Sequence, residues 1–153
     1  MRYFESSGLG KVYTIRINPG EDMLGEIENF IARTGLRYGV ILTGLATFKN
    51  CVLHMVTTTG YPPVEHFERW EDRPLELSAI SGVIADYRPH IHMVVSDKDV
   101  AYSGHCEPGC TILYLCEIVI AEIVEGNFRR VPDANGINQL VAIGEDSVAG
   151  DPE

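Results

Sequence analysis

Helical periodicity occurs once in this sequence, near its beginning, and this feature narrows the folds open to the chain. Apolar side chains recur at helical spacing between residues 23 and 31, where they form one stripe of Met23, Leu24, Ile27, Phe30 and Ile31. The segment 18–22 supplies a turn and acidic residues suited to the positive end of a helix dipole. Gly35 stands where a left-handed C-terminal cap would lie. We therefore expect one helix between this turn and Gly35.

The rest of the pattern is almost entirely that of strands. Strands are expected at residues 11–17, 38–42, 51–58, 75–80, 82–84, 89–95, 100–102 and 110–125. Small residues at 43–47 and 104–108 indicate bends, and residues 61–76 include a long acidic connection of the kind that is usually functional or mobile. One early helix and about seven strands after it predict a single α+β domain with a mostly antiparallel sheet.

Composition and charge exclude several classes of protein. The chain has 153 residues, 45% of them hydrophobic, which is typical of one folded domain and not of a disordered chain. Its net charge of -10 argues against a nonspecific nucleic-acid binder, because phosphate neutralisation supplies most of that affinity. Neither a signal-peptide core nor an apolar run long enough for a membrane span occurs, so we expect a cytoplasmic protein without a membrane partner.

The C-terminal segment differs in composition from the rest of the chain. From residue 132 onward it carries five acidic residues and no Lys or Arg. We therefore expect a domain at residues 1–130 and an acidic, partly mobile tail at 131–153. Apolar residues in this tail, Ile137, Leu140, Val141 and Ile143, are able to pack onto a neighbour.

Three histidines are the strongest chemical signal. His90 and His92 fall at positions i and i+2 of an expected strand, so their side chains project from the same face. The turn at residues 96–99 reverses the chain, which allows His105 to return to the same region. Three neutral imidazoles and one open position are typical of a catalytic zinc site. Because a His-x-His pair on a strand needs no metal, the spacing alone leaves two solvent-exposed histidines as the alternative.

Other polar and sulfur-containing residues have weaker signals. His54 lies in an apolar strand pattern, which favours a hydrogen-bonded structural role, whereas His66 lies in the acidic connection and is either solvated or part of a lid. Cys51 and Cys116 are expected to be buried reduced thiols. Cys106 and Cys110 are expected to be the same, with a local pair of metal ligands as the alternative.

Glu117 interrupts an otherwise apolar strand pattern. A buried carboxylate is costly unless it is paired, and such groups gather at functional sites. If it faces the histidines, Glu117 is a fourth ligand, a partner of a ligand, or a general base. The alternative is a charge that faces solvent or crosses a subunit interface.

Several short motifs in one order resemble the plants-and-prokaryotes-conserved (PPC) domain in its free-standing prokaryotic form. They include residues 16–24, 43–47 and 74–82, and the most specific part runs from Pro89-His90-Ile91-His92 through Gly104-His105 to Glu117. The match spans residues 12–125. Ala46, Val83 and Cys106 depart from the usual pattern near the expected site, so the preference for ligand or substrate is expected to differ from that of relatives.

The resemblance implies an α/β domain that assembles as a homotrimer. It also implies that His90, His92 and His105 hold a metal, typically zinc, or another divalent transition metal. A small polar metabolite is then the expected ligand, with Glu117 as the catalytic group, and hydrolase, hydratase and lyase reactions are all compatible. Two alternatives stay open: a metal that only stiffens the trimer, and a regulatory or DNA-binding module without catalysis, after the label that this family often carries.

Overall fold

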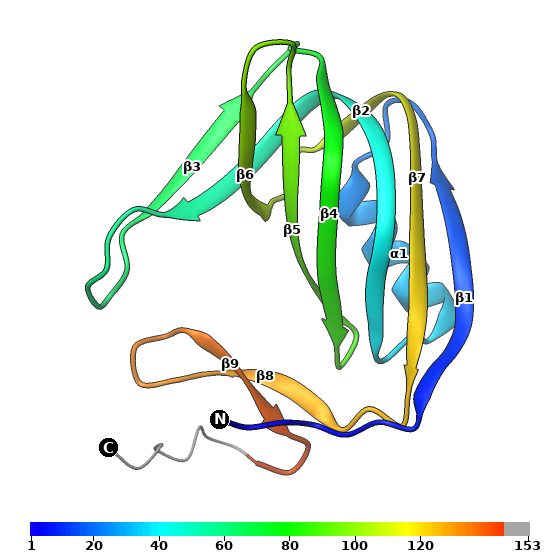
Figure 1. Cartoon of the computed structure of the whole chain (residues 1–153), viewed down its shortest axis with the longest axis vertical. Helices are drawn as coiled ribbons and strands as arrows, with labels where there is room; N and C mark the ends of the chain where they lie inside the picture. Colours follow the sequence, from blue (N-terminus) through cyan, green and yellow to red (C-terminus); the bar gives the residue numbers. More distant parts are fainter. Residues whose placement is uncertain (146–153) are drawn as a thin grey trace.

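The computed structural model describes residues 1–145, which form one large antiparallel sheet, one helix and a separate hairpin (Figure 1). The sheet contains seven strands in the order β1-β7-β2-β4-β5-β6, with β3 paired to β2. The strands are β1 (Gly8–Ile17), β2 (Gly39–Val56), β3 (Glu65–Trp70), β4 (Leu75–Ala85), β5 (Arg88–Ser96), β6 (Ala101–Cys106) and β7 (Thr111–Val124). The hairpin consists of β8 (Phe128–Pro132) and β9 (Asn138–Ala142). The predicted α+β domain with an antiparallel sheet is confirmed.

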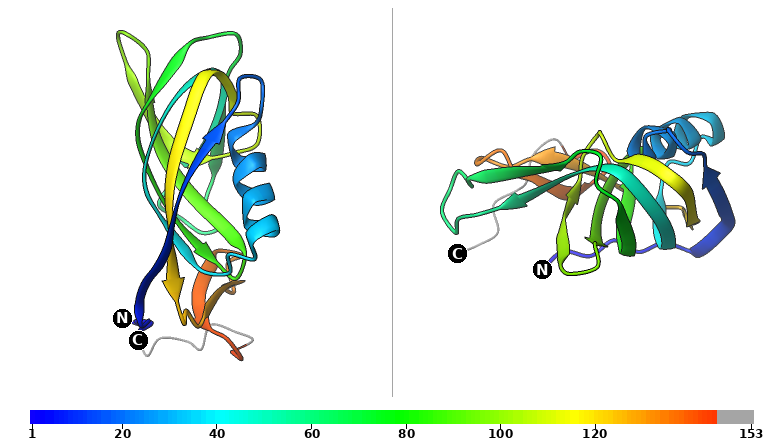
Figure 2. Two further views of the ribbon diagram at one scale, coloured as in Figure 1. Left: turned by 90° about the vertical axis from the view of Figure 1, so that its right-hand side faces the viewer. Right: turned by 90° about the horizontal axis from the view of Figure 1, so that it is seen from above.

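The helix α1 (Met23–Thr34) lies where the sequence predicts it. Asp22 caps its first turn, because the side chain accepts a hydrogen bond from the Gly25 N–H, and Gly35 ends it in the left-handed conformation with φ of 69°. Met23, Ile27 and Ile31 are buried in the main core. The helix itself lies against one face of the sheet (Figure 2). No helix within residues 1–145 is long and apolar enough to cross a membrane.

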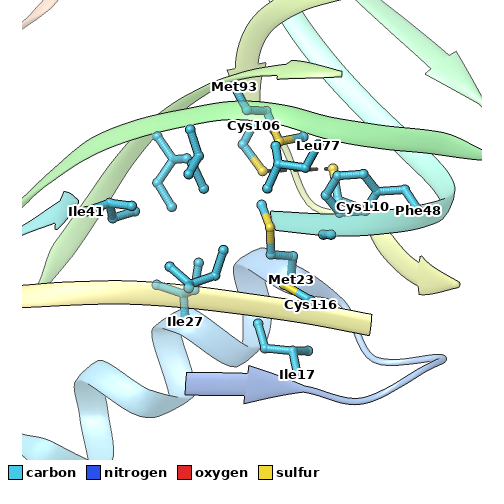
Figure 3. Packing of buried hydrophobic residues seen from close by; sticks show 14 of the residues in the cluster. Ile17, Met23, Ile27, Ile41, Phe48, Leu77, Met93, Cys106, Cys110 and Cys116 are labelled. Atoms are coloured by element: carbon cyan, nitrogen blue, oxygen red, sulfur yellow. Dashed lines mark hydrogen bonds between the residues drawn. The ribbon is translucent and has the colours of Figure 1, made fainter. Parts of the chain in front are cut away.

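The main core lies between this helix and the sheet. Apolar side chains from α1, β2, β4, β5 and β7 meet there, among them Phe48, Leu77 and Met93 (Figure 3). All four cysteines are buried free thiols, as predicted. The Sγ atoms of Cys106 and Cys110 lie 3.9 Å apart inside this core.

One expected bend and one expected division between strands are absent from the structure. Residues 39–56 form a single strand, because the small residues at 43–47 are absorbed as register shifts against β7 instead of ending the strand. Residues 75–85 are likewise continuous. The acidic connection expected within residues 61–76 is not a loop throughout. Residues 65–70 in its centre form β3, which pairs with the end of β2.

One end of the sheet closes on itself. Strand β6 pairs with β5 along most of its length and also with β2 through Leu53 and His54, so β2, β4, β5 and β6 form a ring. Gly104 permits this approach, because a Cβ atom there would lie 2.7 Å from the carbonyl oxygen of His54. The histidine that follows Gly104 is therefore held from both sides.

The C-terminal hairpin packs beside the strand ends of the sheet, near the start of β5 (Figure 1). The ring of Phe128 lies 5.0 Å from that of Tyr38, and Val131 and Val141 are buried. Strand β8 spans the position where the acidic tail was expected to begin. The last residues of the tail were expected to be mobile. Residues 146–153 lie outside the part of the chain that the structure describes.

Candidate metal centre

A tight turn positions the first two histidines. Strands β4 and β5 are joined by Asp86 and Tyr87 alone, and both residues have positive φ (51° and 67°), as a type I′ hairpin requires. Arg37 pairs with Asp86 at 2.7 Å and lies over the ring of Tyr87. Strand β5 then alternates around the buried Ile91, so His90 and His92 project together from the face opposite the core.

Strand β6 brings in the third histidine. His105 lies directly opposite His92 in the β5–β6 register. It belongs to the end of the strand, not to the bend that the sequence predicted at 104–108. The three histidines therefore come from adjacent strands and share one face.

The geometry of this group fits a metal ion. The Nε2 atoms of His90 and His92 are 3.2 Å apart, and one ligand atom from each of the three residues lies within 4.8 Å of the others. Two nitrogens bound tetrahedrally to zinc at ~2.05 Å would be separated by about 3.3 Å. Within residues 1–145, no other group of three or more His, Cys, Asp or Glu side chains comes this close.

The surroundings favour the neutral form of two of these imidazoles, those of His90 and His105. Burial, and then the neighbouring His105 and Arg130, lower the pKa of His90 to about 4. Burial also lowers the pKa of His105, although Glu107 acts in the opposite direction. A neutral imidazole is the form that binds a metal, so the site is ready for one at neutral pH.

A carboxylate and a fourth histidine lie beside the group. His54 is hydrogen-bonded through Nδ1 to Glu107 at 3.2 Å and lies 3.3 Å from Glu65 through Nε2, while its ring stacks on Phe67. Glu107 also lies 3.9 Å from Nε2 of His105. The sequence analysis missed Glu107, whose only signal is its position two residues after a candidate ligand.

The structure does not bring Glu117 to the histidines of its own chain. It lies on β7, paired with Arg16 and Leu45, and β2 and β4 separate β7 from β5. Its side chain is exposed on the sheet face that also carries the histidines. His66 is exposed on β3, where its ring is hydrogen-bonded to Glu68 at 2.9 Å.

A cleft of about 770 Å³ opens beside the histidines. His90 and His105 line one part of it, and the β4–β5 turn and the hairpin strand β8 line the rest, with Arg130 among the lining residues. In the sequence, Arg130 is distinguished only as the second of two adjacent arginines, Arg129 and Arg130. Nothing in the sequence pattern indicates that β8 folds back to the histidines.

The chain matches the model of the Plants and Prokaryotes Conserved domain over residues 4–124, which is most of its length. The chain belongs to this family. The resemblance carried by the histidine motif and the small-residue segments is thereby confirmed, and this PPC domain includes all three candidate ligands. Arg130 lies beyond the matched region.

Two curated proteins are similar to most of this chain. The chain is 32% identical over 144 residues to a bifunctional protein GlmU of Synechococcus, covering 93% of the chain and 21% of that protein. The chain thus spans about a fifth of the length of the curated relatives it matches.

Solved structures share the fold. A metal-containing protein of Archaeoglobus fulgidus is 23% identical with a TM-score of 0.75, over 92% of this chain and 99% of that one. A plant- and prokaryote-conserved protein of Pyrococcus horikoshii is 22% identical, also with a TM-score of 0.75, over 94% and 97% of the two chains.

Proposed function

We propose that this PPC domain is a homotrimeric metalloprotein that holds zinc, or another divalent transition metal, and binds or transforms a small polar metabolite. His90, His92 and His105 are the metal ligands. The observation that carries the proposal is the convergence of their ring nitrogens, with Nε2 of His90 and Nε2 of His92 3.2 Å apart.

The donor set supports zinc in particular. Imidazole suits zinc, copper, iron and nickel, and three histidines leave a coordination position open to a ligand. When bound, the metal would act as a Lewis acid on an oxygen atom of the metabolite. One structural relative is described as metal-containing, which supports a metal ion at this site.

Homotrimer formation is the second part of the proposal. The sheet face opposite the helix exposes apolar side chains on neighbouring strands, among them Val12, Leu45 and Leu115, with exposed fractions of 43–60%. Exposed apolar side chains gathered on one sheet face are often covered in interfaces between proteins. Association through this face would bury it.

In this proposal, Glu117 acts across the interface between protomers and not at the histidines of its own chain. It lies on the same sheet face, opposite Leu45 in the register, and two strands separate its own strand from the histidine strands. We propose that it assists proton transfer at the site of a neighbouring protomer.

Metal analysis of the purified protein tests the ligand assignment. We expect about one ion per chain in the wild type and in a His66→Ala control, and a loss of nearly all bound metal in the His90→Ala, His92→Ala double variant. The control removes an exposed histidine that lies outside the group. Equal, substoichiometric metal in all three proteins would end the proposal.

A further inference from the structure

The cleft beside the histidines also contains a guanidinium group from the C-terminal hairpin. Arg130 lies on β8, outside the region that matches the family, and lines the cleft together with His90 and His105. The guanidinium and the two imidazoles therefore open onto one cavity. The hairpin is held there by the packing of Phe128 against Tyr38 and Ala85.

Arg130 differs from the paired arginines of this protein. Arg37 is bonded to Asp86, and Arg73 is bonded to Asp97. The Arg130 side chain is partly buried, and its hydrogen bond is a long one of 3.4 Å from Nη1 to the carbonyl oxygen of Arg88. Within residues 1–145, no carboxylate oxygen lies within 4.0 Å of it.

The charges around the cleft leave this guanidinium uncompensated. Of the two acidic residues that line the cleft, Asp86 is engaged by Arg37, and Glu28 is exposed on α1. Burial lowers the pKa of Arg130, which reflects incomplete hydration of the charge. A partly desolvated cation that no carboxylate within residues 1–145 pairs with costs free energy that an anionic ligand would offset.

We infer that the cleft is a subsite for small molecules that carry an oxyanionic group, a carboxylate or a phosphate, with Arg130 as the residue that binds this group. The planar guanidinium suits both anions, because its paired N–H donors match two oxygens at once. This subsite rests on the proposed function in one respect: the end of the ligand that lies away from its oxyanionic group would face the histidines. A metal cation held there would increase the preference for an anion.

Calorimetric titration with two probe anions tests this subsite. Zinc-loaded and metal-free proteins are titrated with inorganic phosphate and, separately, with succinate, at constant ionic strength. We expect at least one anion to bind, and its affinity to fall about tenfold or more in Arg130→Gln, with Arg130→Lys intermediate. Arg33→Gln, which removes an exposed arginine at the end of α1, should leave the affinity unchanged.

The outcomes separate the two proposals. Absence of binding by either anion, or equal affinity in wild type and Arg130→Gln, would overturn the subsite even if the histidines hold zinc. Anion binding that depends on Arg130 in a protein whose metal content does not depend on His90 and His92 would support the subsite and end the metal assignment. Phosphate binding alone, or succinate binding alone, supports the subsite and identifies the group. Arg130→Lys keeps the test valid if Arg130→Gln does not fold.

Discussion

Asp22 joins two distant parts of the chain through one carboxylate. Its Oδ1 atom accepts a hydrogen bond of 2.9 Å from the Gly25 N–H and caps the helix. Its Oδ2 atom accepts one of 2.8 Å from the Gly109 N–H, in the connection between β6 and β7. A single side chain therefore fixes the helix start against the connection that follows the histidine strand.

Replacement of Asp22 should destabilise the fold through both bonds. We expect Asp22→Ala to lower the free energy of unfolding by about 2 kcal/mol, the sum of a lost cap and a lost charge-assisted hydrogen bond. Asp22→Asn, which keeps a capping oxygen, should lose less. Urea denaturation followed by circular dichroism measures both, and equal losses in the two variants would contradict the dual role.

At the residue scale, the sequence predicted the convergence of the three histidines better than their surroundings. His90 and His92 follow from the period of a strand, and His105 from one short reversal, which are local patterns. Arg130 could not be found in this way, because its position depends on packing between Phe128 and Tyr38, ninety residues apart in the chain. Tertiary contacts of this kind leave no periodic signal.

At the scale of elements, the turn between β5 and β6 sets the register of the histidine strands. The Oδ1 atom of Asp97 accepts hydrogen bonds of 2.8 Å from the N–H groups of Asp99 and Val100, and its other oxygen accepts one from Arg73. These bonds lower the pKa of Asp97 from 3.8 to about 2. The ionised carboxylate is therefore favoured in the folded protein.

The sign of the pH dependence follows from this shift. Because the pKa is lower in the folded than in the unfolded chain, the contribution of Asp97 is fully present above about pH 4 and is lost as the pH falls towards 2. We expect Asp97→Asn to be less stable than wild type at pH 7, and the difference to shrink between pH 4 and pH 2. Urea unfolding at several pH values measures it, and a constant difference would contradict the role of the charge.

The number of strands in the sheet was predicted more accurately than where each strand begins and ends. Residues 38–58 were expected to form two strands with a bend, yet small residues in a sheet centre allow bulges without ending the strand. Strand β3 was missed because its sequence, Glu-His-Phe-Glu-Arg-Trp, is charged at three of six positions and lies in a segment that was expected to be an acidic connection. The β8–β9 hairpin had a usable signal in Asn135-Gly136, a turn sequence between two short apolar runs.

At the scale of the whole molecule, the sheet is covered by the helix on one face only (Figure 2). The opposite face carries the histidines, Glu117 and the exposed apolar side chains of Val12, Leu45 and Leu115. A trimer formed through this face would connect assembly with the candidate metal centre.

A charge placed on this face should prevent assembly. We expect the wild type to have a mass in light scattering close to three times that of the 16.9-kDa chain, and Leu45→Glu to shift it to one chain. Val64→Glu, at a side chain with similar exposure in the loop before β3, should remain trimeric. A monomeric wild type, or an unchanged mass in Leu45→Glu with circular dichroism confirming its fold, would contradict the proposed interface.

The ring formed by β2, β4, β5 and β6 has a consequence for selectivity among metal ions. A flexible set of nitrogens adapts to each divalent ion and follows the general order of affinities, in which copper binds most tightly. Here β6 is hydrogen-bonded on both edges, and Gly104 leaves no room for it to shift. The backbone positions that carry the histidines are thus held before any ion arrives. In the proposed metal site, this would favour an ion whose size and coordination geometry match the arrangement over the ion that binds imidazole most strongly.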